Sequence, residues 1–237
     1  YKKPDYEEKV SAAKARVLQG ETIQATIDAR YYFGEPVKNA KETYAVYRSA
    51  YWAPILYADR DEDFDSGGAP DEDGNGPVGG QESEQTGTLD ADGKLVVTIP
   101  TTLSKDKTDA IYRVEARVTD EGNREISGTG YIIATYGSFA VDVEPDRYVY
   151  APGDRAVFTI TARNYDNPAV RTAVKADLEE WRWDGKAKSV VKASASAQTD
   201  PQGAAKIEFQ IPSGGSFRVR VSASTPEGRV VEGSTYL

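Results

Sequence analysis

The sequence predicts an all-β protein built from two tandem immunoglobulin-like or fibronectin III-like antiparallel β-sandwiches. One observation is that most segments alternate apolar and polar residues and end at turn residues, while helical periodicity is hard to find. The other is that one ordered set of motifs occurs twice in the 237 residues. A chain of this length has room for two domains that each bury a core.

The two clearest copies of the repeated unit are RVLQGETIQATIDARYYFGEPV at 16–37 and RYVYAPGDRAVFTITARNYDNPAV at 147–170. In each copy a turn at Gly20 or Gly153 precedes a run in which every second residue is apolar. Successive side chains of a strand point to opposite faces, so each run predicts one buried face. The residues expected on these faces are Ile23, Ala25, Ile27 and Ala29, and then Ala156, Phe158, Ile160 and Ala162.

The remaining segments follow in the same order in both copies. Further strands are expected in the first copy at 6–10, 42–51, 94–99, 110–119 and 125–136, and in the second at 139–143, 172–183, 206–211, 217–221 and 233–236. We therefore predict domains at 1–136 and 138–237. An acidic, glycine-rich insert at about 59–87 lengthens the first copy, and its few apolar side chains predict a mobile loop.

Composition excludes several classes of function. With no cysteine and no histidine, the chain has no disulfide, no thiolate metal site, no cysteine nucleophile and no imidazole base. A net charge of −9 disfavours binding to nucleic acid or to anionic lipid. No apolar run approaches the roughly 18–20 residues of a membrane-spanning helix, so we expect no membrane insertion.

An enzymatic role is also disfavoured. The sequence has no glycine-rich phosphate loop and no nucleophile elbow, and none of its many carboxylates stands beside an apolar pocket signal. We therefore expect no catalytic residues and no cofactor. The chain starts at Tyr1 and contains no methionine, which favours a segment of a longer protein. We expect this segment to be monomeric by itself.

At these motifs the chain resembles the macroglobulin-type domains of the alpha-2-macroglobulin family, the protease-trapping inhibitors. The first copy is similar to the third such domain through PDYE at 4–7 and ARYYFGEPV at 29–37, and the second to the fourth through YAPGD at 150–154 and TDPQG at 199–203. The lack of cysteine is more typical of a bacterial member. The resemblance implies a seven-stranded fibronectin-like sandwich for each copy. It also implies a location in the periplasm, outside the cell or elsewhere in the cell envelope.

The resemblance also implies a scaffold role. In the family, a protease cuts a bait segment, the domains rearrange, and an internal thioester then bonds to the protease. The thioester motif contains cysteine, so it lies outside this chain, and no segment here is assigned as bait. The partners implied are the other domains of the parent chain and, through the parent, the target proteases.

One acidic segment carries a weak signal for calcium. Asp61, Asp63, Asp65 and Glu72 have spacing similar to an EF-hand loop, which supplies oxygen ligands around one cation. Ser66 replaces the glycine that the sharp turn of such a loop needs, and helical patterns are missing on both sides. Solvated, mutually repelling carboxylates are therefore the favoured interpretation, and no metal is expected.

Aromatic residues offer an alternative function. Trp181 and Trp183 fall on the same strand face as Asp177 and Glu179, which favours an exposed aromatic contact or a local bulge. A second group, Tyr44, Tyr47, Tyr51, Trp52 and Tyr57, is expected to pack in the core or between domains. Exposed rings stack on sugars, so the alternative is a bacterial surface adhesin or glycan-binding module.

Overall fold

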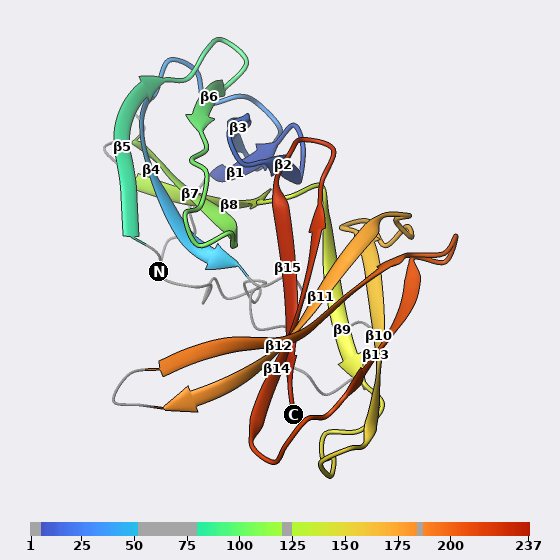
Figure 1. Cartoon of the computed structure of the whole chain (residues 1–237). Coiled ribbons are helices and arrows are strands. Elements are labelled where there is room, and N and C mark those ends of the chain that lie inside the picture. The colour runs from blue at the N-terminus through green and yellow to red at the C-terminus, as the bar shows by residue number, and fades with distance from the viewer. Residues whose placement is uncertain (1–5, 52–79, 120–124, 184–186) are drawn as a thin grey trace. The chain divides into compact units, whose positions relative to one another are not determined.

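The computed structural model describes residues 6–51, 80–119, 125–183 and 187–237 (Figure 1). The regular secondary structure of these residues consists of β-strands without a helix, as predicted. They form two compact units that divide in the sequence between Tyr136 and Gly137. Each unit contains two sheets, and almost all strand pairs are antiparallel. The fold is therefore the tandem β-sandwich that the sequence predicts.

The first unit pairs a three-stranded sheet, in the order β1-β3-β6, with a five-stranded sheet, in the order β2-β8-β7-β4-β5. The smaller sheet consists of β1 (Tyr6–Ala12), β3 (Thr22–Tyr31) and β6 (Lys94–Pro100). The larger sheet consists of β2 (Arg16–Leu18), β8 (Glu125–Thr135), β7 (Asp109–Thr119), β4 (Lys41–Tyr51) and β5 (Gly80–Thr88). Among the described strands of this unit, β2 alone runs parallel to its neighbour, β8.

The second unit repeats this arrangement, with sheets in the orders β13-β10-β9 and β12-β11-β14-β15. The smaller sheet consists of β9 (Phe139–Pro145), β10 (Arg155–Asn164) and β13 (Ala204–Gln210). The larger sheet consists of β11 (Ala173–Trp183), β12 (Ala187–Gln198), β14 (Ser216–Ser224) and β15 (Val230–Tyr236). Apart from β2, each strand of the first unit thus has a counterpart in the second.

Equivalent positions make equivalent contacts in the two units. Ala29 of β3 and Ala162 of β10 each donate a backbone hydrogen bond to a turn glycine, Gly93 or Gly203, at 2.9 and 2.8 Å. Both glycines have positive φ, +72° and +76°. The eight alternating residues predicted to face the interior from β3 and β10 are buried, which confirms the predicted faces.

A β-bulge occupies the same place in the larger sheet of both units. The register of β4 with β5 shifts between Val46 and Tyr47, and that of β11 with β12 shifts between Leu178 and Glu179. The extra residue lies on the outer strand in both cases. A bulge bends its strand and increases the local twist, so this shared irregularity extends the likeness of the two units beyond strand order.

The expectation of a mobile loop over 59–87 is wrong at its carboxyl-terminal end. Residues 80–87 belong to β5, which pairs with β4 from Lys41 to Arg48. The ladder is held by backbone groups, so the strand forms although its side chains are polar and mostly exposed. The earlier part of the predicted insert lies outside the described residues, as do Trp52 and Tyr57. Tyr44 and Tyr51 are buried, as expected for packing.

Candidate functional site

The outer face of the larger sheet in the second unit carries the polar and aromatic side chains that the sequence singled out. Strand register places Asp177, Glu179 and Trp181 of β11 opposite Arg220, Arg218 and Ser216 of β14. On the other side of β11, the partners of Glu179 and Trp181 on β12 are Val191 and Ser189. We call this surface the β11 outer face.

Glu179 is the centre of a hydrogen-bonded ion network on the β11 outer face. Its Oε2 atom accepts hydrogen bonds from Arg218 Nε at 3.0 Å and from Ser189 Oγ at 2.8 Å. Its Oε1 atom accepts one from Arg220 Nε at 2.9 Å. The side chain of Glu179 is only 4% exposed, so both of its oxygens are held by the protein rather than by water.

Asp177 extends the network along β11. It forms an ion pair with Lys175 at 3.0 Å and a longer one with Arg220 at 3.7 Å, and it accepts a hydrogen bond from Ser194. Arg220 also approaches Glu232 of β15, at 3.9 Å. The basic side chains of this face are thus paired with acidic side chains of the same sheet: Lys175, Arg218 and Arg220 with Asp177, Glu179 and Glu232.

The pKa values of the two carboxyl groups reflect these contacts. Burial raises the pKa of Glu179, but hydrogen bonds from Arg218 and Ser189 lower it more, so the net pKa lies below its ordinary value. For Asp177, burial is likewise outweighed by hydrogen bonds from Ser194 and Lys175, so its net pKa is also lowered. Both groups are therefore carboxylates at neutral pH, and neither is suited to act as a general acid.

Trp181 is one of two exposed aromatic side chains described on this face, the other being Tyr236 of β15, which pairs with Arg218. Trp181 is 43% exposed and lies next to Glu179 along the outward row of β11. Trp181 thus lies in the outward row of β11 with Asp177 and Glu179, and its role as an aromatic contact stays a prediction. Trp183 is the last residue of β11 and pairs with Ala187, but its side chain lies outside the described part of the structure.

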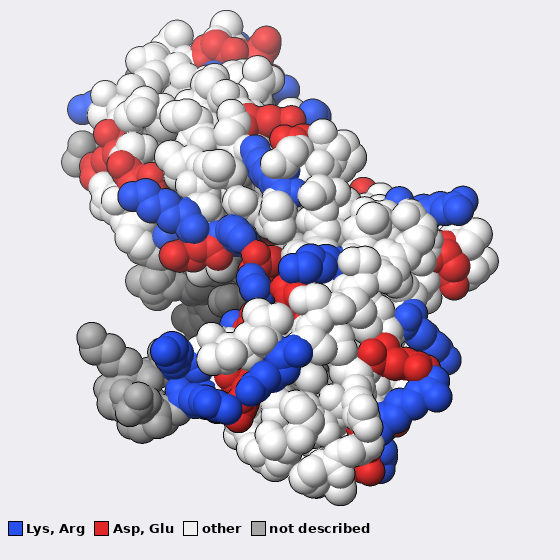
Figure 2. Space-filling view, in the orientation of Figure 1, with Lys and Arg blue, Asp and Glu red and all other residues white. Residues whose placement is uncertain are grey.

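The sequence alone missed the arginine half of the network. Arg218 and Arg220 alternate on β14 and Asp177 and Glu179 alternate on β11, so each strand by itself shows only the ordinary pattern of an outer face. The signal that could have found the network is the pairing of two strands with opposite charges at matching spacing. Figure 2 shows basic and acidic side chains interleaved on the visible surface rather than gathered into a patch of one sign.

The acidic calcium candidate, formed by Asp61, Asp63, Asp65 and Glu72, lies outside the described residues. Within the described part of the chain, no group of three or more acidic, histidine or cysteine side chains is placed to hold a metal ion. The same part contains no helix with the length and apolar character needed to cross a bilayer.

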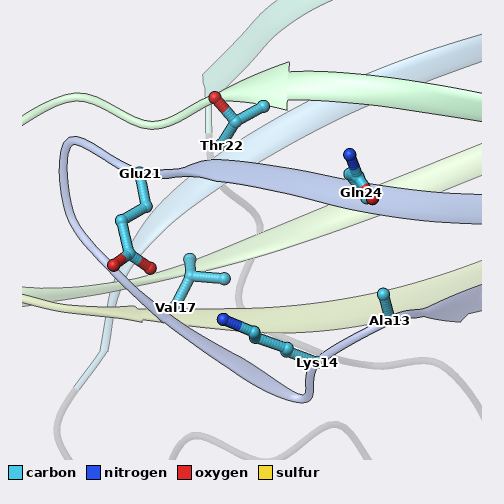
Figure 3. A pocket seen from close by; sticks show the side chains of 6 residues that line it. All are labelled: Ala13, Lys14, Val17, Glu21, Thr22 and Gln24. Carbon is cyan, nitrogen blue, oxygen red and sulfur yellow. The ribbon is translucent and has the colours of Figure 1, made fainter.

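A small hollow of about 180 Å³ lies beside the first strands of the first unit (Figure 3). It is lined by Ala13, Lys14, Val17, Glu21, Thr22 and Gln24. Glu21 accepts a hydrogen bond from the Leu18 backbone N–H at 3.2 Å, which holds its carboxylate against the loop. Pockets for organic ligands usually have about 300–1,000 Å³, so this hollow is too small for one.

Comparison with solved structures identifies proteins that share this fold. The chain matches Salmonella alpha-2-macroglobulin reacted with methylamine over 100% of its own length, with a TM-score of 0.64 and 13% identity. It matches trypsin-activated alpha-2-macroglobulin from Escherichia coli over 98% of its length, with a TM-score of 0.65 and 13% identity. The fold is that of a segment of bacterial alpha-2-macroglobulins.

The similarity covers only part of those proteins. The chain spans 17% of the Salmonella structure and 16% of the trypsin-activated E. coli structure. An E. coli alpha-2-macroglobulin activated by porcine elastase matches the whole chain with a TM-score of 0.63 and 12% identity, over 22% of that structure. No protein-family model and no curated protein sequence matches the chain.

Proposed function

We propose that the chain is a non-catalytic scaffold segment of an alpha-2-macroglobulin-like, protease-trapping inhibitor. It comprises two macroglobulin-like domains, at 1–136 and 138–237, which resemble the third and fourth domains of that family. Its partners are the other domains of its parent chain and, through the parent, target proteases in the periplasm or elsewhere in the cell envelope. By itself the segment is monomeric.

The observation that carries this proposal is the extent of the structural match. Single β-sandwiches occur in proteins of many functions, so one matching domain would say little about role. Here the match covers both units in tandem and 98–100% of the chain. The two units also share strand order, turn contacts and a bulge, which supports a pair of like modules in a longer array.

The β11 outer face supports a structural role over ligand binding. A sugar-binding surface needs polar groups that are free to reach the hydroxyls beside the stacking ring. The charges beside Trp181 are instead used within the sheet, as the contacts of Glu179 show. An ion network of this kind fixes the pairing of β11 with β14, which suits a rigid module that moves as one body.

The test is protease trapping by the parent protein. The parent, which contains this chain, is mixed with trypsin, and trypsin activity is measured on a large protein substrate and on a small peptide substrate. If the parent encloses trypsin, trypsin should lose its activity on the large substrate and keep its activity on the small one. The isolated chain, as the control, should change neither activity at equimolar concentration.

Two outcomes would refute the proposal. One is a parent that leaves trypsin fully active on the large substrate at every ratio tested. The other is an isolated chain that itself inhibits trypsin or turns over a substrate in proportion to its concentration, because a passive segment does neither.

A further inference from the structure

Two glutamates face each other in the interior of the first unit. Glu8 lies on β1 of the smaller sheet and Glu42 lies on β4 of the larger sheet, so their carboxyl groups meet between the two sheets. Glu42 is fully buried, at 0% exposure, and Glu8 is partly buried. A buried carboxylate is costly unless a cation or several hydrogen-bond donors compensate its charge.

The surroundings supply little such compensation. Oε1 of Glu42 accepts a hydrogen bond from the Arg117 backbone N–H at 2.7 Å. Oε2 of Glu42 and both carboxyl oxygens of Glu8 are buried and make no well-formed hydrogen bond with the described residues, although the backbone groups of Val118 and Gly128 lie near enough to Glu8 to lower its pKa in part. Two groups that only accept hydrogen bonds therefore face each other, and a proton on one of them would supply the missing donor.

The neighbouring strands turn no described lysine or arginine toward the pair. By strand alternation, the described titratable side chains nearest the pair in this interior are tyrosines, Tyr31 of β3, Tyr44 of β4 and Tyr112 of β7. The interior positions of β8 nearest the pair are Ile126 and Gly128, and none of the described interior positions of β5 or β6 is charged. Arg48 also falls in the inward row of β4, opposite Tyr112, but it is six residues along the strand from Glu42. The other charged residues described on β1, β3, β4, β6, β7 and β8 fall in the outward rows.

The second unit shows that the fold does not require carboxyl groups at these positions. Glu8 pairs with Ala29, and the equivalent alanine of the second unit, Ala162, pairs with Val141. Glu42 is the second residue of β4, and the second residue of the equivalent strand β11 is Val174. Val141 and Val174 are 1% and 2% exposed. An apolar pair thus fills the same place in the sister sandwich, and the acid pair is a property of the first unit alone.

We propose that Glu8 and Glu42 hold a shared proton in the folded first unit, and that loss of this proton loosens the contact between its two sheets. Burial raises the pKa of Glu8, and the negative charge of Glu42 raises it further, while the backbone groups of Val118 and Gly128 oppose the shift in part. Burial raises the pKa of Glu42, while hydrogen bonding with Glu8 and with the backbone of Arg117 and Thr43 lowers it in part. Because of the Glu8–Glu42 pair, the stability of the first unit decreases as pH rises.

The direction of the effect follows from proton linkage. Both carboxyl groups have a higher pKa in the folded unit than the ordinary value of 4.5 that they take when unfolded. The folded unit therefore binds more protons above about pH 4.5, and its stability falls as pH rises from there through the raised values. For each proton involved, the unfolding equilibrium constant increases by up to about tenfold per pH unit.

The test uses the whole chain and two readouts. Carbon-13 NMR of the glutamate carboxyl groups follows protonation directly between pH 4 and pH 10, and scanning calorimetry follows unfolding between pH 5 and pH 9. We expect two carboxyl resonances that titrate well above 4.5 and one unfolding transition whose midpoint falls with pH. The double variant Glu8→Val/Glu42→Val, which copies the second unit, should lose both the resonances and the pH dependence.

Glu7→Gln is the matched control, because Glu7 is the preceding residue of β1 and is exposed. It should leave the pH dependence unchanged. The proposal is overturned if Glu8 and Glu42 titrate near 4.5 in the unmodified chain, a result that needs no variant to fold. It is also overturned if the double variant retains the full pH dependence, or if millimolar calcium or magnesium at pH 8 stabilises the unmodified chain and not the double variant, since the occupant would then be a cation.

Discussion

Gly203 shows how a single residue fixes the turn that the two units share. Its φ of +76° lies in the left-handed region, and a Cβ atom added to it would lie 2.5 Å from the Ala162 carbonyl oxygen. The tight approach exists because the Gly203 carbonyl accepts a hydrogen bond from the Ala162 N–H of β10 at 2.8 Å. The sequence predicted this turn from TDPQG at 199–203, because glycine and aspartate favour such a conformation.

We therefore expect Gly203→Ala to destabilise the second unit. The left-handed conformation alone costs about 1–2 kcal/mol for a residue with a Cβ atom, and the contact with Ala162 adds to that cost. Chemical denaturation of the whole chain measures the change. Gly214→Ala is the control, because an added Cβ meets nothing within 4 Å there, and an equal loss of stability in both variants would contradict this account.

Among the contacts of single residues, the ion pairs between side chains of different strands could not be predicted from the sequence. Alternation along β11 is enough to place Trp181 in one row with Asp177 and Glu179, since one strand carries that information. The contacts of Glu179 with Arg218 and Arg220 depend on which strand lies beside β11 and in which register. The pairing of Glu8 with Glu42 depends in the same way on how two sheets face each other.

At the scale of elements, the strands rich in alternating apolar residues were predictable and the outer strands were less so. β3 and β10 carry a clear apolar face, and the structure buries it. β5 has a polar sequence, GQESEQTGT, so its strand character comes from hydrogen bonding to β4 rather than from its own side chains. β2 has three residues, too few to show a period, and it was not predicted.

The central strand β11 depends on its inward side chains. Leu178 is fully buried next to the bulge, while Val191 on the neighbouring strand is 51% exposed. We expect Leu178→Ala to cost about 2–5 kcal/mol of unfolding free energy, because it removes buried methyl groups and leaves a cavity. Val191→Ala should cost far less in the same denaturation experiment. Similar losses in both variants would mean that the face of β11 has been assigned wrongly.

At the scale of the whole molecule, the two units respond to pH in opposite directions. The lowered pKa of Glu179 makes a contribution to the second unit that is present above about pH 4.5 and is lost as pH falls through the lower, folded-state value. The Glu8–Glu42 pair contributes in the opposite sense, because its pKa values are raised. Acid therefore weakens the second unit, and alkali weakens the first.

Glu179→Gln tests the acid side of this contrast. At pH 7 the variant should lose about 1–3 kcal/mol, because Arg218 and Arg220 lose a buried charged partner. The difference from the unmodified chain should shrink as pH falls below the lowered folded-state pKa of Glu179, where the side chain is protonated in both the folded and unfolded states. Calorimetry across this range is the measurement. Glu208→Gln removes an exposed ion pair with Arg155 and should have little effect at any pH.

The shared bulges also bear on solubility. The outer strands β5 and β12 end the larger sheets among the described residues, and each carries one residue that does not fit the ladder with its neighbour. An uninterrupted outer strand is a template on which another polypeptide can add by backbone pairing, whereas a bulged and twisted one is a poor template. In a protein that contains many such sandwiches in tandem, the bulges thus disfavour edge-to-edge aggregation of the domains.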